Sequence, residues 1–275
     1  MALKTLVDGL AFAEGLRWHD GQLWFSDMHD ESVWRVSEDG THHRVCEVAG
    51  RPSGLGWLPN GDLLVVSMMD KKVLRLDSKG ALSVHADLSA VAPRRINDMV
   101  VDNAGRAYVG NFGFDFEEGE PQAATPLAVV EPDGRVMATA DELIFPNGMV
   151  ITADGKVLVA AETFASCLTA FEIGADGSLS DRRVWAEIGG DAVPDGICMD
   201  AKGAIWVASP TTGECLRIVE GGEVTGRVET GRQAIACALG GASGDVLFIA
   251  TSASVARDEC RALRSGRIEY VVTPK

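Results

Sequence analysis

Residues 147–161 read NGMVITADGKVLVAA, and residues 195–209 read DGICMDAKGAIWVAS. In each stretch a polar residue and a glycine open an apolar run, a turn containing glycine follows, and a second apolar run comes next. Apolar runs of this length on either side of a glycine turn are typical of two antiparallel β-strands. The two stretches therefore predict the same strand–turn–strand unit at two places in the chain.

This unit recurs six times along the chain. The copies begin at Glu14, Ser53, Asn97, Asn147, Asp195 and Ile235, which are 39, 44, 50, 48 and 40 residues apart. A third strand pattern follows most copies, and a period of this size is that of a four-stranded propeller blade. No segment has a 3.6-residue apolar period over a helical length. We therefore expect residues 1–275 to form a single all-β domain, a six-bladed β-propeller.

The N-terminal residues precede the first copy of the unit. Residues 1–10 read MALKTLVDGL and contain one short strand pattern. We expect this strand to pair with the last blade and close the ring, which removes exposed strand edges.

Composition limits the partners that the chain can bind. With 25 Lys and Arg against 40 Asp and Glu, the formal net charge is −15, which repels nucleic acid and anionic membrane surfaces. No stretch reaches the roughly 18 apolar residues of a membrane-spanning helix, and the N-terminus lacks a secretory signal pattern. The six cysteines show no metal-binding spacing. We expect a cytoplasmic protein with reduced thiols and a small-molecule ligand, and the sequence leaves protein partners open.

Four copies of the unit begin with a side chain that carries oxygen. Glu14, Asn97, Asn147 and Asp195 hold the same register, while Ser53 and Ile235 fill the other two positions. Turn chemistry explains Asn or Asp before glycine, but Glu is a poor turn residue. In a propeller this register points towards one end of the central channel, so we expect the four side chains to converge there. Independent turns are the alternative.

The residue types at this register indicate a metal. Carboxylate and amide oxygens without His or Cys suit a hard divalent cation, and two facing carboxylates repel each other without one. We predict one divalent ion, with Ca²⁺ the first expectation and Zn²⁺, Mg²⁺ or Mn²⁺ as alternatives.

Four ordered motifs carry a resemblance to a known family. They read EGLRW from Glu14, RRINDMVVDNAGRAYVGNFG from Arg94, FPNGMVITADGK from Phe145 and VPDGICMDAKGAIWVA from Val193. Together they resemble the senescence-marker-protein, gluconolactonase and luciferin-regenerating-enzyme family over essentially the whole chain. The resemblance implies a six-bladed propeller with one divalent metal in its channel and, in many members, hydrolysis of lactones.

The resemblance also implies roles for individual residues. Glu14, Asn147 and Asp195 match the metal ligands, and Asn97 matches a residue that reaches the metal or the substrate. Arg95 matches a substrate-binding arginine, and Asp195 matches the general base. The chain departs from the family pattern in Leu16, where Pro is common, and in Met99, where Gly is common, so the substrate stays open.

These observations predict a metal-dependent lactonase that acts on a sugar-acid or similar small lactone. A phosphotriesterase-like hydrolase on the same metal site is one alternative, because a Lewis-acidic ion serves both electrophiles. A non-catalytic, metal-stabilised binding propeller is the other.

The longest interruption of the repeat is a candidate loop over the channel mouth. It covers residues 111–126 and reads NFGFDFEEGEPQAATP. Phe112, Phe114 and Phe116 alternate within it. They predict either an apolar rim that faces the substrate or a strand with one buried side.

Overall fold

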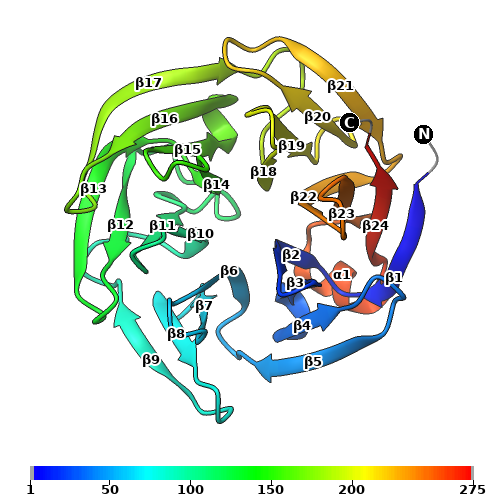
Figure 1. Ribbon diagram of the computed structural model, residues 1–275, viewed down its shortest axis with the longest axis horizontal. Helices are drawn as coiled ribbons and strands as arrows, with labels where there is room; N and C mark the ends of the chain where they lie inside the picture. The colour runs from blue at the N-terminus through cyan, green and yellow to red at the C-terminus, as the bar shows by residue number, and fades with distance from the viewer. Residues whose placement is uncertain (1–2, 274–275) are drawn as a thin grey trace.

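The computed structural model describes residues 3–273 and contains, within them, six four-stranded antiparallel sheets arranged in a ring (Figure 1). This arrangement confirms the predicted six-bladed propeller. The strands nearest the axis of the ring are β2, β6, β10, β14, β18 and β22, and each begins one copy of the sequence unit.

The six blades follow one another along the chain. Blade one contains β2 (Ala13–His19), β3 (Gln22–Asp27), β4 (Ser32–Val36) and β5 (His42–Glu47), and blade two contains β6 (Pro52–Trp57), β7 (Leu63–Ser67), β8 (Lys72–Leu76) and β9 (Leu82–Asp87). Blade three contains β10 (Ile96–Val101), β11 (Ala107–Asn111), β12 (Thr125–Val130) and β13 (Val136–Leu143). Blade four contains β14 (Pro146–Ile151), β15 (Val157–Glu162), β16 (Cys167–Ile173) and β17 (Leu179–Glu187). Blade five contains β18 (Ile197–Met199), β19 (Ile205–Ser209), β20 (Glu214–Ile218) and β21 (Val224–Glu229).

The sixth blade joins the two ends of the chain. It consists of β22 (Gln233–Gly240), β23 (Val246–Ser252), β24 (Gly266–Val272) and, outermost, β1 (Lys4–Leu10). β1 pairs antiparallel with β24, with Lys4 opposite Tyr270 and Leu10 opposite Gly266. The prediction that residues 1–10 contain a strand that closes the ring is confirmed for the part of that segment that the structure describes.

The second strand of each blade explains the continuous apolar runs in the sequence. Every residue of β7, β11 and β19 is buried, because blades pack on both faces of these strands. The outer strands β5 and β9 are mostly exposed or half-buried. The core therefore lies between neighbouring blades.

The sequence did not predict the one α-helix of the described chain, α1 (Arg257–Leu263), which has seven residues. Two short 3₁₀ helices, η1 (Met28–Asp30) and η2 (Thr163–Ala165), were also missed. Segments this short do not complete an apolar periodicity that could be read from sequence. No helix within residues 3–273 is long and apolar enough to cross a membrane. The six cysteines are free thiols, as expected.

Candidate active site

The four predicted site residues lie at one end of four inner strands. Glu14 is in β2, Asn97 in β10 and Asn147 in β14, and Asp195 comes two residues before β18. Glu14, Asn97 and Asn147 are buried, whereas Asp195 is partly exposed. The shared register therefore places them at equivalent positions of blades one, three, four and five.

A β-bulge disturbs the inner strands at this register. In β2 the pairing shifts by one residue between Glu14 and Arg17, and β10 and β14 show the same shift beside Asn97 and Asn147. β6 and β22 are shifted at the corresponding place. An extra residue bends a strand and re-aims its side chains, and such bulges are common next to active sites. In β10 four consecutive residues at this place, Ile96–Met99, are buried.

The glycines that follow the site residues allow neighbouring blades to approach each other. A Cβ atom on Gly148 would lie 2.6 Å from the backbone nitrogen of Ile197, and one on Gly196 would lie 2.6 Å from the Cα of Ala236. Asn147 and Gly148 lie within β14, so the alternative that they form an independent turn is wrong. Glycine is needed here because backbones from adjacent blades touch.

Hydrogen bonds connect the site residues of blades four and five. Asn147 Nδ2 donates to Thr163 Oγ1 at 3.2 Å, and Thr163 Oγ1 donates to the carbonyl of Pro194 at 2.8 Å. The Gly148 N–H donates to the carbonyl of Asp195 at 3.2 Å. Sequence reasoning missed Thr163; the signal was its position directly after β15, at the end of the blade that carries Asn147.

The carboxyl groups near the axis influence one another. Burial raises the pKa of Glu14 well above its usual value, and the negative charges of Asp195 and Asp98 raise it further. Burial also raises the pKa of Asp195, with a further contribution from Asp98, while a hydrogen bond with Asn147 opposes this rise. Repulsion of this kind acts over short distances, so the carboxyl groups of Glu14, Asp98 and Asp195 influence one another near the axis of the ring.

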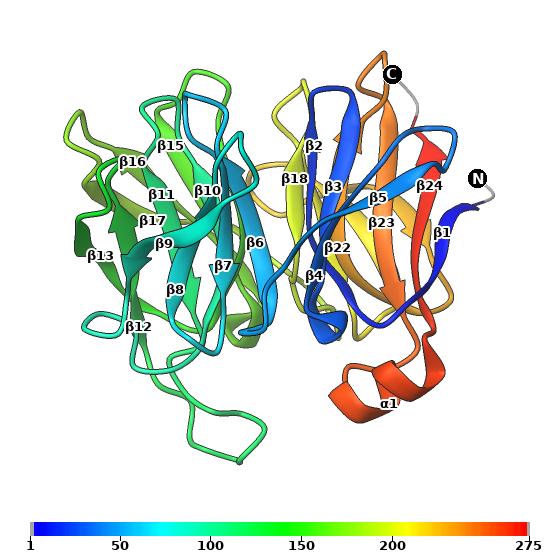
Figure 2. The same cartoon turned by 90° about the horizontal axis from the view of Figure 1, so that it is seen from below.

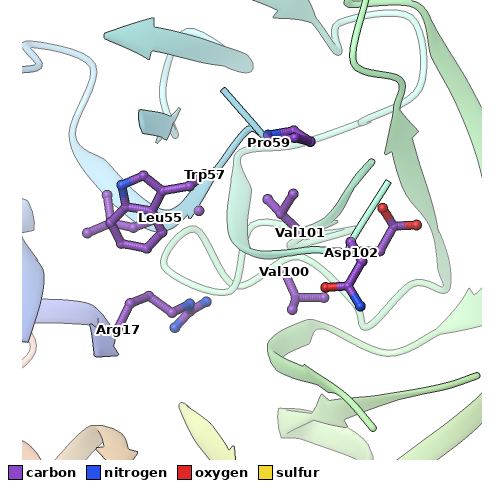
Figure 3. A pocket seen from close by; sticks show the side chains of 9 residues that line it. Arg17, Leu55, Trp57, Pro59, Val100, Val101 and Asp102 are labelled. Atoms are coloured by element: carbon purple, nitrogen blue, oxygen red, sulfur yellow. The ribbon is translucent and has the colours of Figure 1, made fainter. Parts of the chain in front are cut away.

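Arg17 and Asp98 form an ion pair that sequence reasoning also missed. Arg17 Nη2 lies 2.7 Å from Asp98 Oδ1 and donates a second bond to the carbonyl of Met99 at 2.6 Å. The available signal was a second charged residue within the inner strand β2, three positions after Glu14. Arg17 also borders a cavity of about 320 Å³ that Leu55, Trp57 and Val100 help to line (Figure 3).

The donor set fits a hard divalent cation. Two carboxylates and two amides supply oxygen atoms, and in blade two Ser53, at the same register, has a buried hydroxyl without a hydrogen-bond partner in the described chain. Residues 3–273 contain no group of three or more His, Cys, Asp or Glu side chains arranged to hold a metal. The structure therefore does not show a central metal site. A site formed by the carboxylates of Glu14 and Asp195 together with the side-chain amides of Asn97 and Asn147 stays a prediction.

Arg95 lies beside the loop that connects β11 with β12. Its guanidinium pairs with Asp115 at 2.8 Å and Glu117 at 3.0 Å and lies over the ring of Phe112, 5.1 Å from the centroid. The loop contains no strand between residues 112 and 124, so the strand interpretation of its alternating phenylalanines is wrong. Figure 2 shows this loop and α1 projecting from the same end of the ring.

Comparison with known proteins gives one family. The family described as SMP-30/Gluconolactonase/LRE-like region matches residues 12–253.

Three solved structures illustrate the shared fold. A calcium-binding protein, regucalcin, from Agrobacterium tumefaciens is 21% identical, with a TM-score of 0.82, covering 100% of this chain and 95% of the other. A gluconolactonase from Xanthomonas campestris is 24% identical, with a TM-score of 0.79 and coverages of 99% and 89%. A luciferin-regenerating enzyme is 17% identical, with a TM-score of 0.81 and coverages of 99% and 95%.

Proposed function

The chain belongs to the SMP-30/gluconolactonase/LRE-like family, and we propose on this basis that it is a metal-dependent hydrolase that opens the ring of a small lactone. The observation that carries the proposal is the position of Asp195, which stands at the register of Glu14, Asn97 and Asn147 at one end of the inner strands. Burial and the negative charge of Asp98 raise the pKa of its carboxyl group, and a perturbed pKa of this kind is typical of a group that exchanges protons with a substrate.

Glu14, Asn97, Asn147 and Asp195 would hold one divalent ion. Ca²⁺ is the first candidate, supported by the calcium-binding relative, and Zn²⁺, Mg²⁺ and Mn²⁺ are alternatives. When bound, the ion would act as a Lewis acid towards the carbonyl oxygen of the lactone.

Asp195 is proposed as the general base. In the protein without a bound cation, burial and the negative charge of Asp98 raise the pKa of its carboxyl group, so this group binds a proton more readily than an ordinary aspartate. An Asp195 carboxylate oxygen takes a proton from water as the water oxygen bonds to the carbonyl carbon. When the ring C–O bond breaks, Asp195 returns the proton to the departing alkoxide, which leaves a hydroxy acid.

Arg95 and Asn97 are proposed to bind the substrate. Two guanidinium nitrogens of Arg95 donate to Asp115 and Glu117, and the remaining N–H groups are available to a substrate oxygen. The amide of Asn97 makes one long contact of 3.5 Å with the carbonyl of Pro146, so it has donor and acceptor capacity to spare.

The test is lactone hydrolysis by Asp195→Asn across a metal titration, with bound metal quantified at each point. Asn keeps an oxygen ligand but not the base, so we expect turnover to fall about 10²–10⁴-fold even at full occupancy. Asp191→Asn, an exposed change four residues earlier, is the matched control.

Near-parental turnover of Asp195→Asn at full metal occupancy would remove the general-base assignment. A phosphotriester is included in the substrate panel. Its hydrolysis without any lactone hydrolysis would favour the phosphotriesterase alternative, and inactivity on both would favour a binding propeller.

A further inference from the structure

We propose that the substrate is a lactone with an apolar substituent, and that this substituent packs on the exposed faces of Phe116 and Phe164. The inference rests on the proposed lactonase function and adds the class of substrate to it. It comes from an aromatic cluster at the end of the propeller that carries the predicted site residues.

Five of the nine phenylalanines of the chain form this cluster. Ring centroids lie 4.3 Å apart for Phe112 and Phe145, 5.0 Å for Phe145 and Phe164, and 5.8 Å for Phe116 and Phe164. Phe114 completes the set, 5.3 Å from Phe164. The rings come from two neighbouring blades, three and four, and form one continuous apolar group.

Residues of the cluster are close neighbours, along the chain, of residues of the candidate active site. Phe145 comes two residues before Asn147, and Phe164 directly follows Thr163, which accepts the hydrogen bond of Asn147. The N–H of Phe112 donates to the carbonyl of Arg95 at 2.9 Å. Aromatic rings and predicted substrate-binding groups are therefore joined by short stretches of backbone.

Two rings of the cluster are partly exposed to solvent. Seven of the nine phenylalanines are at most 7% exposed, whereas Phe116 and Phe164 are each 39% exposed. The two exposed phenylalanines of the molecule are thus neighbours in one patch. Adjoining exposed aromatic rings next to a polar site are typical of surfaces that bind an apolar group.

Ion pairs flank Phe116 on both sides in the sequence. Its neighbours Asp115 and Glu117 both pair with Arg95, and Glu120 accepts a 3.0 Å bond from Arg94 Nε. These contacts connect the loop that carries Phe116 to Arg94 and Arg95, directly before β10.

The chemistry of the patch discriminates between lactones. Hydroxyl groups of a sugar lactone would find no hydrogen-bond partner on ring faces, so they would lose water without compensation. An alkyl substituent would instead bury its own apolar surface together with the exposed faces of the two phenylalanine rings. Each buried methylene raises affinity by roughly two- to fourfold.

The experiment uses γ-lactones with no side chain and with methyl, ethyl, butyl and hexyl side chains, compared with glucono-δ-lactone. We expect kcat/KM to rise with chain length, mainly through a lower KM. The double variant Phe116→Ser, Phe164→Ser should lose this rise. Met137→Ser, which changes a residue 49% exposed on the outer strand β13, should keep it.

The matching alkyl γ-lactams resist hydrolysis, so calorimetry with them measures binding alone. It separates the proposed apolar substrate site from the proposed lactonase function. Lactone hydrolysis that does not depend on chain length would overturn this inference and leave the lactonase function standing. Lactam affinity that rises with chain length only when both rings are present, without hydrolysis of any lactone, would support the apolar site and overturn the lactonase function. No chain-length dependence in either measurement would overturn the inference.

Discussion

The guanidinium of Arg17 in β2 lies 2.7 Å from the carboxylate of Asp98 in β10, so the inner strands of blades one and three are joined by an ion pair between a half-buried arginine and a buried aspartate. Arg17→Met should destabilise the protein by about 1–3 kcal/mol, because the buried side chain of Asp98 then loses its hydrogen-bonding partner. Urea unfolding measures the loss. Adding Asp98→Asn should recover much of it, and a double variant as unstable as the sum of the two single changes would contradict the coupling.

Glu14 and Asn147 test the predicted metal site. Glu14→Gln or Asn147→Ala should lower the affinity for a divalent ion by more than about tenfold, because each removes a predicted ligand. Titration calorimetry on the metal-free protein measures the affinity, and circular dichroism checks that the propeller still folds. Glu187→Gln at the exposed edge of β17 is the control. Affinities equal to that control would exclude the two residues as ligands.

Gly148 tests the close approach of blades four and five. Gly148→Ala should cost about 1–3 kcal/mol of unfolding free energy, because the new methyl group would meet the backbone of residues 195–197 at 2.6–2.8 Å. At Gly189 a Cβ atom would have no neighbour within 4 Å, so Gly189→Ala should change stability by less than about 0.5 kcal/mol. Equal changes in unfolding free energy for the two variants would show that the backbone of blade five does not exclude a side chain at position 148.

His29 predicts a loss of stability in acid. Burial lowers its pKa to about 4, whereas an unfolded histidine titrates near pH 6.5. Its neutral form therefore supports the fold above pH 6.5, and that support is lost as the pH falls towards 4. We expect the histidine to account for a decrease of about 2 kcal/mol in unfolding free energy between pH 7 and pH 5.

The measurement is urea unfolding at both pH values. His29→Gln should lack this part of the pH dependence, because the amide does not titrate. His43→Gln, an exposed change in β5, should behave like the parent. A parental decrease in His29→Gln would assign the acid sensitivity to other groups.

Much of the architecture could be predicted from sequence because the signals are local. Strand–turn–strand units at a steady period predicted six blades, and the strand in residues 1–10 predicted the closure by β1. The oxygen-bearing residues Glu14, Asn97, Asn147 and Asp195 were found for the same reason, since their register repeats with the unit. Short helical segments such as α1 were missed because seven residues carry too little periodicity.

The sequence by itself determined the number of blades and the residues that share one register, because alternating and continuous apolar runs reflect strand burial directly. Only the tertiary structure decided which of their neighbours meet. The bulge beside Asn97 and Asp98 depends on how β10 pairs with β11, and the ion pair between Arg17 and Asp98 joins two residues that are 81 positions apart in the chain. The ion pairs of Arg95 with Asp115 and Glu117, on either side of Phe116, likewise connect segments about 20 residues apart. Such contacts form between segments that are distant in the sequence, so no local sequence pattern predicts them.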